Sequence, residues 1–126
     1  MAEIPADLLY TTDHEYVRRN PDGTVTVGIT DYAQGELGDI VYVELPKVGA
    51  TYGAHDVFGT IEAVKAVSEL FAPIAGEIVE VNTRLDKEPS LVNTSTYEDG
   101  WMIKVRPSGE LTGLMDAAAY AKQVGQ

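Results

Sequence analysis

One lysine, Lys65, lies in the middle of a valine-rich stretch that spans residues 59–70 and reads GTIEAVKAVSEL, with carboxylates at Glu62 and Glu69. A lysine in such a stretch is often an ordinary strand residue whose ammonium group reaches water. A Schiff-base lysine needs a desolvated pocket that lowers its pKa, whereas neighbouring carboxylates favour the charged form. A third role is covalent modification, for which a long stem that holds the amine away from the surface is well suited.

The composition excludes several other kinds of chemistry. The 126 residues are enough for one domain with a hydrophobic core. No cysteine is present, so disulfides, thiolate metal sites and a cysteine nucleophile are excluded. The two histidines, His14 and His55, lack a metal-binding spacing, and no metal site is predicted. The net charge of −11 argues against nucleic acid and anionic membranes as partners and is compatible with steering toward basic patches on proteins.

Alternating β-branched residues and turn signals predict a mostly β chain. A helix of at most two turns is expected over residues 31–37, ended by Gly38, and a C-terminal helix near residues 110–123. Residues 1–9 are expected to form a loose arm that packs late, and residues 82–100 an irregular segment. The expected strands span residues 14–19, 24–30, 39–45, 57–63, 66–72, 77–81 and 101–106.

A weak internal repeat places the lysine in the fold. GDIVYVEL, from Gly38, matches GEIVEVNT, from Gly76, and each is followed by a polar segment and another strand, the second copy being about four residues longer. Such duplication predicts a sandwich with pseudo-two-fold symmetry, in which Lys65 sits at the connection between strands 57–63 and 66–72. A tight turn there lacks glycine, so we expect strained residues at positive φ. The alternative is one long bent strand with no turn.

Several long stretches resemble the H-protein family of the glycine cleavage system, whose members are lipoyl carriers. The resemblance covers about residues 8–124. It is carried by DHEYVR from Asp13, VGITDYAQGELGDIVYVELPKVG from Val27, EAVKAVSELFAPIAGEIVEVN from Glu62, LVN from Leu91 and YEDGWMIKV from Tyr97.

The resemblance implies a fold and a covalent cofactor. The fold is a lipoyl/biotinyl-carrier-like sandwich (a barrel-sandwich hybrid) of two small antiparallel sheets. Residues 1–126 would form a single domain with a carrier core at about 24–106, on which the N-terminal strand segment and the C-terminal helix pack. Lys65 occupies the position that carries (R)-lipoate in amide linkage, and Glu62 and Gly76 occupy positions recognised by the lipoate-attaching enzyme.

The family's partners are three enzymes, and the carrier has no catalytic residue of its own. Glycine decarboxylase loads the lipoyl arm with an aminomethyl group, aminomethyltransferase unloads it, and dihydrolipoamide dehydrogenase reoxidises it. The resemblance also implies a cleft that shelters the loaded arm, formed by Asp13, His14 and Glu15 with Glu69. Glu69 replaces the more usual aspartate, and His55 stands where a turn glycine is common.

Three alternatives stay open at this point. A lipoyl donor for other complexes would use the same Lys65. A biotin carrier is disfavoured because Val64 and Ala66 stand where methionines usually flank the lysine. An enzyme with a lysine nucleophile would turn over substrate alone. The sequence shows no membrane span and no targeting leader, so a cytoplasmic, bacterial protein is expected, with a monomer as the default.

Overall fold

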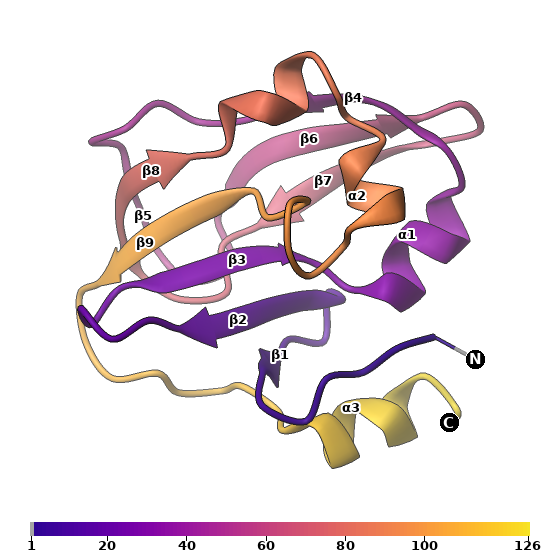
Figure 1. Ribbon diagram of the computed structural model, residues 1–126. Coiled ribbons are helices and arrows are strands. Elements are labelled where there is room, and N and C mark those ends of the chain that lie inside the picture. Colours follow the sequence, from indigo (N-terminus) through magenta and orange to yellow (C-terminus); the bar gives the residue numbers. More distant parts are fainter. Residues whose placement is uncertain (1) are drawn as a thin grey trace.

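The computed structural model describes residues 2–126 and consists mainly of β-strands in two antiparallel sheets (Figure 1). The larger sheet has the order β1-β2-β3-β9-β8-β5, and the smaller has the order β4-β6-β7. The predicted fold class is confirmed. The strands are β1 (Leu9–Tyr10), β2 (Glu15–Arg19), β3 (Val25–Ile29), β4 (Ile40–Glu44), β5 (Thr51–Tyr52), β6 (Val57–Ala63), β7 (Val67–Phe71), β8 (Gly76–Val81) and β9 (Ile103–Pro107).

The main core lies between the two sheets. Central strand β3 is buried along its whole length. Val27 of this strand and Ile103 of the neighbouring β9 are fully buried. From the smaller sheet, Ile61 and Leu70 point into the same core. Burying each such side chain contributes about 1.5–3 kcal/mol. This core therefore fixes the sheet from which the lysine hairpin projects.

The internal repeat corresponds to two equivalent strand pairs, β4–β6 and β8–β9, one in each sheet. Each pair has a register shift at the equivalent place in its first strand. The shift lies between Ile40 and Tyr42 in β4 and between Ile78 and Glu80 in β8, which are 38 residues apart, the offset of the repeat. The residues that pair with them in β6 and β9 are 42 residues apart. The difference between 42 and 38 is the four-residue extra length expected of the second copy. The matched pairs are Ile40–Ala63 and Tyr42–Glu62 in the first copy, and Ile78–Val105 and Glu80–Lys104 in the second.

Strands β6 and β7 form a hairpin with Lys65 at its turn, so the alternative of one bent strand is wrong. The expectation of positive φ in this turn is also wrong. Among residues 2–126, the non-glycine residues at positive φ are His14 and His55. The turn is held instead by the Ala63 N–H, which donates to Ala66 O at 2.7 Å, and by the Val64 N–H, which donates to Asp39 O at 3.0 Å. The segment before β4 thus supports the turn from outside.

Helix α1 (Asp31–Leu37) forms as predicted. The Thr30 hydroxyl caps its N-terminus by accepting from Ala33 N, and Gly38, at φ 85°, ends it. The segment 82–100 is less irregular than expected, because it contains a 3₁₀ turn, η1 (Thr83–Asp86), and a short helix, α2 (Leu91–Thr94). Within residues 2–126, no helix is long and apolar enough to cross a membrane.

Both chain ends differ from the expectations. Helix α3 covers only Ala117–Gln123, and Asp116 is its N-cap. Residues 110–116 are not helical, because Gly113 is at φ 75° and Met115 pairs with Tyr10 through two backbone hydrogen bonds of 2.7 and 2.8 Å. The N-terminal arm is not loose in the described residues, since Leu8 is buried in a second core with the tyrosines of β1, β2 and α3. In Figure 1, α3 lies below β1 and beside the N-terminal segment.

Candidate functional site: a hairpin lysine beside a cleft

Lys65 is exposed in the turn between β6 and β7. Figure 1 shows this turn at the upper right. A Cβ placed on Gly38 would lie 3.1 Å from Lys65 Cε, so the stem of the lysine passes directly over this glycine at the end of α1. The residue before it, Leu37, lines a cleft between α1 and the hairpin. The amine is therefore accessible to a modifying enzyme, and a group attached to it would start at the edge of that cleft.

The surface beneath the lysine is fixed by one amide side chain, Asn93 of α2. Its Nδ2 donates to Gly38 O at 3.0 Å and to Gln34 Oε1 at 2.7 Å, while its Oδ1 accepts from Ile40 N at 2.9 Å. Asn93 thus joins the end of α1 to the start of β4. Between them lies Asp39, whose carbonyl supports the lysine turn, so α2 helps to position the turn.

The cleft has a volume of about 310 Å³ and collects the four residues predicted for arm binding. Asp13 and His14 come from the loop before β2, and Glu15 is the first residue of β2. Glu69 comes from β7. The walls are largely apolar, and the volume is at the low end of the roughly 300–1,000 Å³ typical of small-molecule sites. A flexible aliphatic chain with one polar end fits such a cavity. The apolar lining residues are Ile29, Ala33, Leu37, Ile61 and Leu70.

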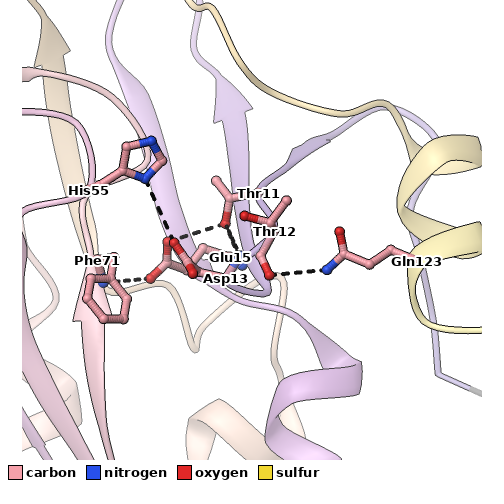
Figure 2. Close-up of polar contacts among 7 residues, drawn as sticks. All are labelled: Thr11, Thr12, Asp13, Glu15, His55, Phe71 and Gln123. Atoms are coloured by element: carbon pink, nitrogen blue, oxygen red, sulfur yellow. Dashed lines mark hydrogen bonds and ion pairs between the residues drawn. The ribbon is translucent and has the colours of Figure 1, made fainter.

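Glu15 is the buried acidic group of the cleft, with only 2% of its surface exposed. The Phe71 N–H donates to its Oε2 at 2.8 Å, and the Thr11 hydroxyl donates to its Oε1 at 3.4 Å (Figure 2). Burial raises the pKa of Glu15 from 4.5 to about 8; the Asp13 charge adds to the increase, and the two hydrogen bonds oppose it. A carboxyl of this kind holds a proton near neutral pH and becomes a carboxylate when a cation is placed beside it.

His14 is held in a left-handed conformation, at φ 65°, by the tight turn over residues 11–15. The backbone N–H of His14 donates to Thr11 O at 3.2 Å, and its backbone carbonyl accepts from Thr30 N at 3.0 Å. Burial lowers the pKa of the imidazole, although Asp13 and Glu36 act in the opposite direction. His55, also at positive φ, places its Nδ1 4.0 Å from Asp13 Oδ2 at the rim of the cleft (Figure 2).

The two predicted enzyme-recognition residues lie in different places. Glu62 is on the lysine hairpin, half-buried, between Tyr42 of β4 and Val67 of β7. Gly76 begins β8 in the other sheet, where it pairs with Tyr52 and Pro107. Figure 1 shows the start of β8 on the side of the sandwich opposite the lysine turn. The structure therefore brings Glu62 near Lys65 and keeps Gly76 away from it.

Sequence reasoning missed several residues that shape the site. Tyr32 and Glu36 of α1 and Ser68 of β7 line the cleft. Tyr32 and Glu36 are four residues apart on one short helix, so they share a face, and this spacing is a signal that was available in the sequence. Asn93 gave no such signal, because its role depends on contacts with residues more than 50 positions away.

A β-sandwich built from two equivalent halves, with an exposed lysine at a hairpin turn beside an apolar cleft, defines a carrier domain of the lipoyl type. The sequence profile described as Glycine cleavage H-protein matches residues 8–126. The chain belongs to this family, whose members are non-catalytic lipoyl carrier components of the glycine cleavage system.

Individual relatives agree with this assignment. The chain is 57% identical to the glycine cleavage system H protein of Prosthecochloris aestuarii, with 98% of each chain covered. It is 54% identical to that of Chromobacterium violaceum, with 99% of each covered. The crystal structure of the H protein from Mycobacterium marinum superposes with a TM-score of 0.89 at 45% identity, covering 98% of this chain and 100% of that one.

Proposed function

We propose that Lys65 carries (R)-lipoate in amide linkage and that the loaded protein is the common substrate of three enzymes. These are glycine decarboxylase, aminomethyltransferase and dihydrolipoamide dehydrogenase. The observation that carries the proposal is the exposed lysine at the turn of the β6–β7 hairpin, with its stem over Gly38, the neighbour of the cleft residue Leu37. Lipoate supplies the disulfide that is reduced when the aminomethyl group is taken up.

The cleft suits this cofactor. The apolar residues among its lining match an aliphatic chain, and its carboxyl groups match an amine at the end of that chain. Glu15 lies among these lining residues, and its carboxyl can give its proton to an amine and then pair with the resulting cation. His14, whose imidazole is biased toward the neutral form, does not repel that cation. Asp13 and Glu69 add negative charge at the rim.

Attachment of the cofactor requires recognition by a lipoate-attaching enzyme, and we assign Glu62 and Gly76 to this step. Glu62 presents its carboxylate on the same hairpin as Lys65. Gly76 acts through backbone shape, because it permits the close approach of β8 and β9. The carrier is further proposed to be one domain that acts as a monomer in the bacterial cytoplasm, in keeping with its bacterial relatives.

The test is the intact mass of the protein after reaction with a lipoate-attaching enzyme. The wild-type protein should gain one lipoyl group, and Lys65→Arg should gain none. Lys47→Arg is the matched control and should be modified like the wild type. Modification of the Lys65→Arg variant at Lys47 or Lys104 would overturn the assignment, as would failure of modified wild-type protein to be reduced by glycine decarboxylase in the presence of glycine.

A further inference from the structure

The hydroxyl of Tyr120 connects the two walls of the arm cleft from behind. It lies 2.8 Å from Nδ1 of His14 and 2.7 Å from Oγ1 of Thr30. His14 belongs to one wall, and Thr30 caps α1, whose residues form the other wall. Tyr120 itself comes from α3, is fully buried and takes no part in lining the cleft.

Helix α3 has a second contact with the same loop. Gln123 Nε2 donates to Thr12 O at 3.1 Å (Figure 2). The ring of Tyr120 also stacks on Tyr10 of β1, with centroids 4.7 Å apart and planes inclined by 8°. The C-terminal helix thus makes two polar contacts with the loop before β2, at Thr12 and His14, and one aromatic contact with β1.

From this arrangement we infer that Tyr120 is a positioning residue for the shelter of the aminomethyl-loaded arm, an inference that rests on the proposed function. Its hydroxyl keeps the His14 loop and the start of α1 at the spacing that closes the cleft. Its contact with Nδ1 also couples the tautomer of His14 to the direction of the Tyr120–Thr30 hydrogen bond. We assign the arrangement in which the Tyr120 O–H donates to Nδ1 and the Thr30 O–H donates to the Tyr120 oxygen, so that the imidazole carries its proton on Nε2.

The tautomer matters because of what surrounds the imidazole. His14 lies beside the carboxylates of Asp13 and Glu36 and packs on the ring of Tyr32, with centroids 5.1 Å apart. Those carboxylates favour protonation of the ring. In the assigned arrangement the lone pair of Nδ1 already accepts a hydrogen bond, which disfavours protonation of the ring beside an amine-bearing arm.

The experiment compares Tyr120→Phe with the wild type in the lipoylated, aminomethyl-loaded protein. After glycine decarboxylase is removed, hydrolysis of the loaded thiol gives formaldehyde, ammonia and free thiol, and formaldehyde release is followed at neutral pH. Tyr120→Phe keeps the stacking on Tyr10 and loses both hydrogen bonds. We expect release to be roughly three- to ten-fold faster, the range for losing one or two buried hydrogen bonds. Lipoylation of Lys65 should be unchanged.

Tyr16→Phe is the matched control, because it removes a buried tyrosine hydroxyl from the same core whose bond to Thr96 O, at 3.1 Å, does not involve the cleft. Its release rate should equal the wild-type rate. A second readout is the ¹⁵N spectrum of His14, which should show the Nε2–H tautomer in the wild type and in Tyr16→Phe but a mixture in Tyr120→Phe.

The possible outcomes separate this inference from the proposed function. Equal release by the wild type and Tyr120→Phe, or equal acceleration by both tyrosine variants, overturns the positioning role and leaves the carrier function intact. An unchanged His14 spectrum overturns the tautomer assignment. If Glu15→Gln releases formaldehyde at the wild-type rate, the cleft gives no shelter, and the proposed use of the cleft fails together with this inference.

Discussion

At the scale of single residues, Glu15 combines burial with a chemical task. A carboxyl that is 2% exposed costs free energy if it ionises without a cation nearby. The two hydrogen bonds it accepts, from Phe71 N and the Thr11 hydroxyl, offset only part of that cost, and its pKa remains raised. The protein thus keeps a proton where the amine of its cargo is expected to bind.

This raised pKa makes the stability of the protein depend on pH in a defined direction. The carboxyl has a pKa near 4.5 when unfolded and about 8 when folded, so the folded state binds more protons between these values. The contribution of the Glu15 carboxyl to the free energy of unfolding is fully present below about pH 4.5. It is lost as the pH rises to about 8, at up to about 1.4 kcal/mol per pH unit. Glu15→Gln should remove this pH-dependent loss of stability.

Urea unfolding of the unmodified protein at intervals from pH 5 to pH 9 measures the effect. The stability of Glu15→Gln relative to the wild type should increase as the pH rises to about 8 and stay level above it. Glu69→Gln serves as control, because Glu69 is exposed and its replacement relieves no burial of a charge. Parallel curves for the wild type and Glu15→Gln would show that Glu15 titrates normally.

At the scale of elements, the strands that alternation and turn signals predict agree with the structure to within about two residues. Their positions follow from local chemistry: β-branched residues, the Asn20–Gly23 turn, and the prolines after β4 and β7. The short strands β1 and β5 were missed because a strand of two residues is too short to show an alternation of apolar and polar residues. Helix α3 was predicted seven residues too long, because Leu111, Leu114 and Met115 have helical spacing but lie in a segment paired with β1.

The candidate site was predictable only where local sequence determines it. The strands beside the lysine and the cap residues of α1 follow from neighbouring residues, whereas the turn at Lys65 was predicted from the internal repeat. The convergence of Asp13, His14, Glu15 and Glu69 came from family resemblance, and the structure brings them together across β2 and β7. The support of the turn by Asp39 O replaces the expected strain, and no local pattern encodes such a contact across 25 residues.

The β8–β9 pair provides a test of what Gly76 does. A Cβ at this position would overlap the carbonyl of Arg106 and lie 2.6 Å from Cγ1 of Val105, both in the neighbouring strand. Gly76→Ala should therefore destabilise the fold by about 2–3 kcal/mol, typical of overpacking. Gly109→Ala, at a position with open space, is the control and should change stability by less than about 0.5 kcal/mol. Thermal unfolding measures both.

The same variant separates stability from enzyme recognition. If Gly76 acts only through the strand pairing, the folded fraction of Gly76→Ala should be lipoylated at the wild-type rate. A slower rate at a temperature where the variant is fully folded would support direct recognition by the lipoate-attaching enzyme. An unchanged melting temperature would contradict the close approach of β8 and β9.

At the scale of the whole molecule, the described chain has two separate cores that meet at the site. One lies between the sheets and includes Ile61 and Leu70 of the lysine hairpin. The other is built from Leu8 and four buried tyrosines, Tyr10, Tyr16, Tyr97 and Tyr120, and includes residues from both ends of the described chain. The cleft lies where they adjoin, since Ile61 and Leu70 line it on one side and His14, which contacts Tyr120, lines it on the other.

This division predicts two levels of local stability. Helix α3 is seven residues long and touches the sheets mainly through the short strand β1, so it should open without unfolding of the sandwich. Amides that hold the chain ends, such as Met115 N bonded to Tyr10 O, should exchange with solvent at a lower opening free energy than the amides of Val27 and Val105. Native-state hydrogen exchange by NMR measures both sets in one sample.

The lysine hairpin is the internal control for this experiment. The amide of Val64 donates to Asp39 O at the edge of the sandwich and does not contact the tyrosine core. Tyr120→Phe should lower the opening free energy of the Met115 amide and leave that of Val64 unchanged. If all of these amides open together at the global free energy of unfolding, the chain has a single cooperative core, and the His14 wall of the cleft is then as rigid as the hairpin that presents Lys65.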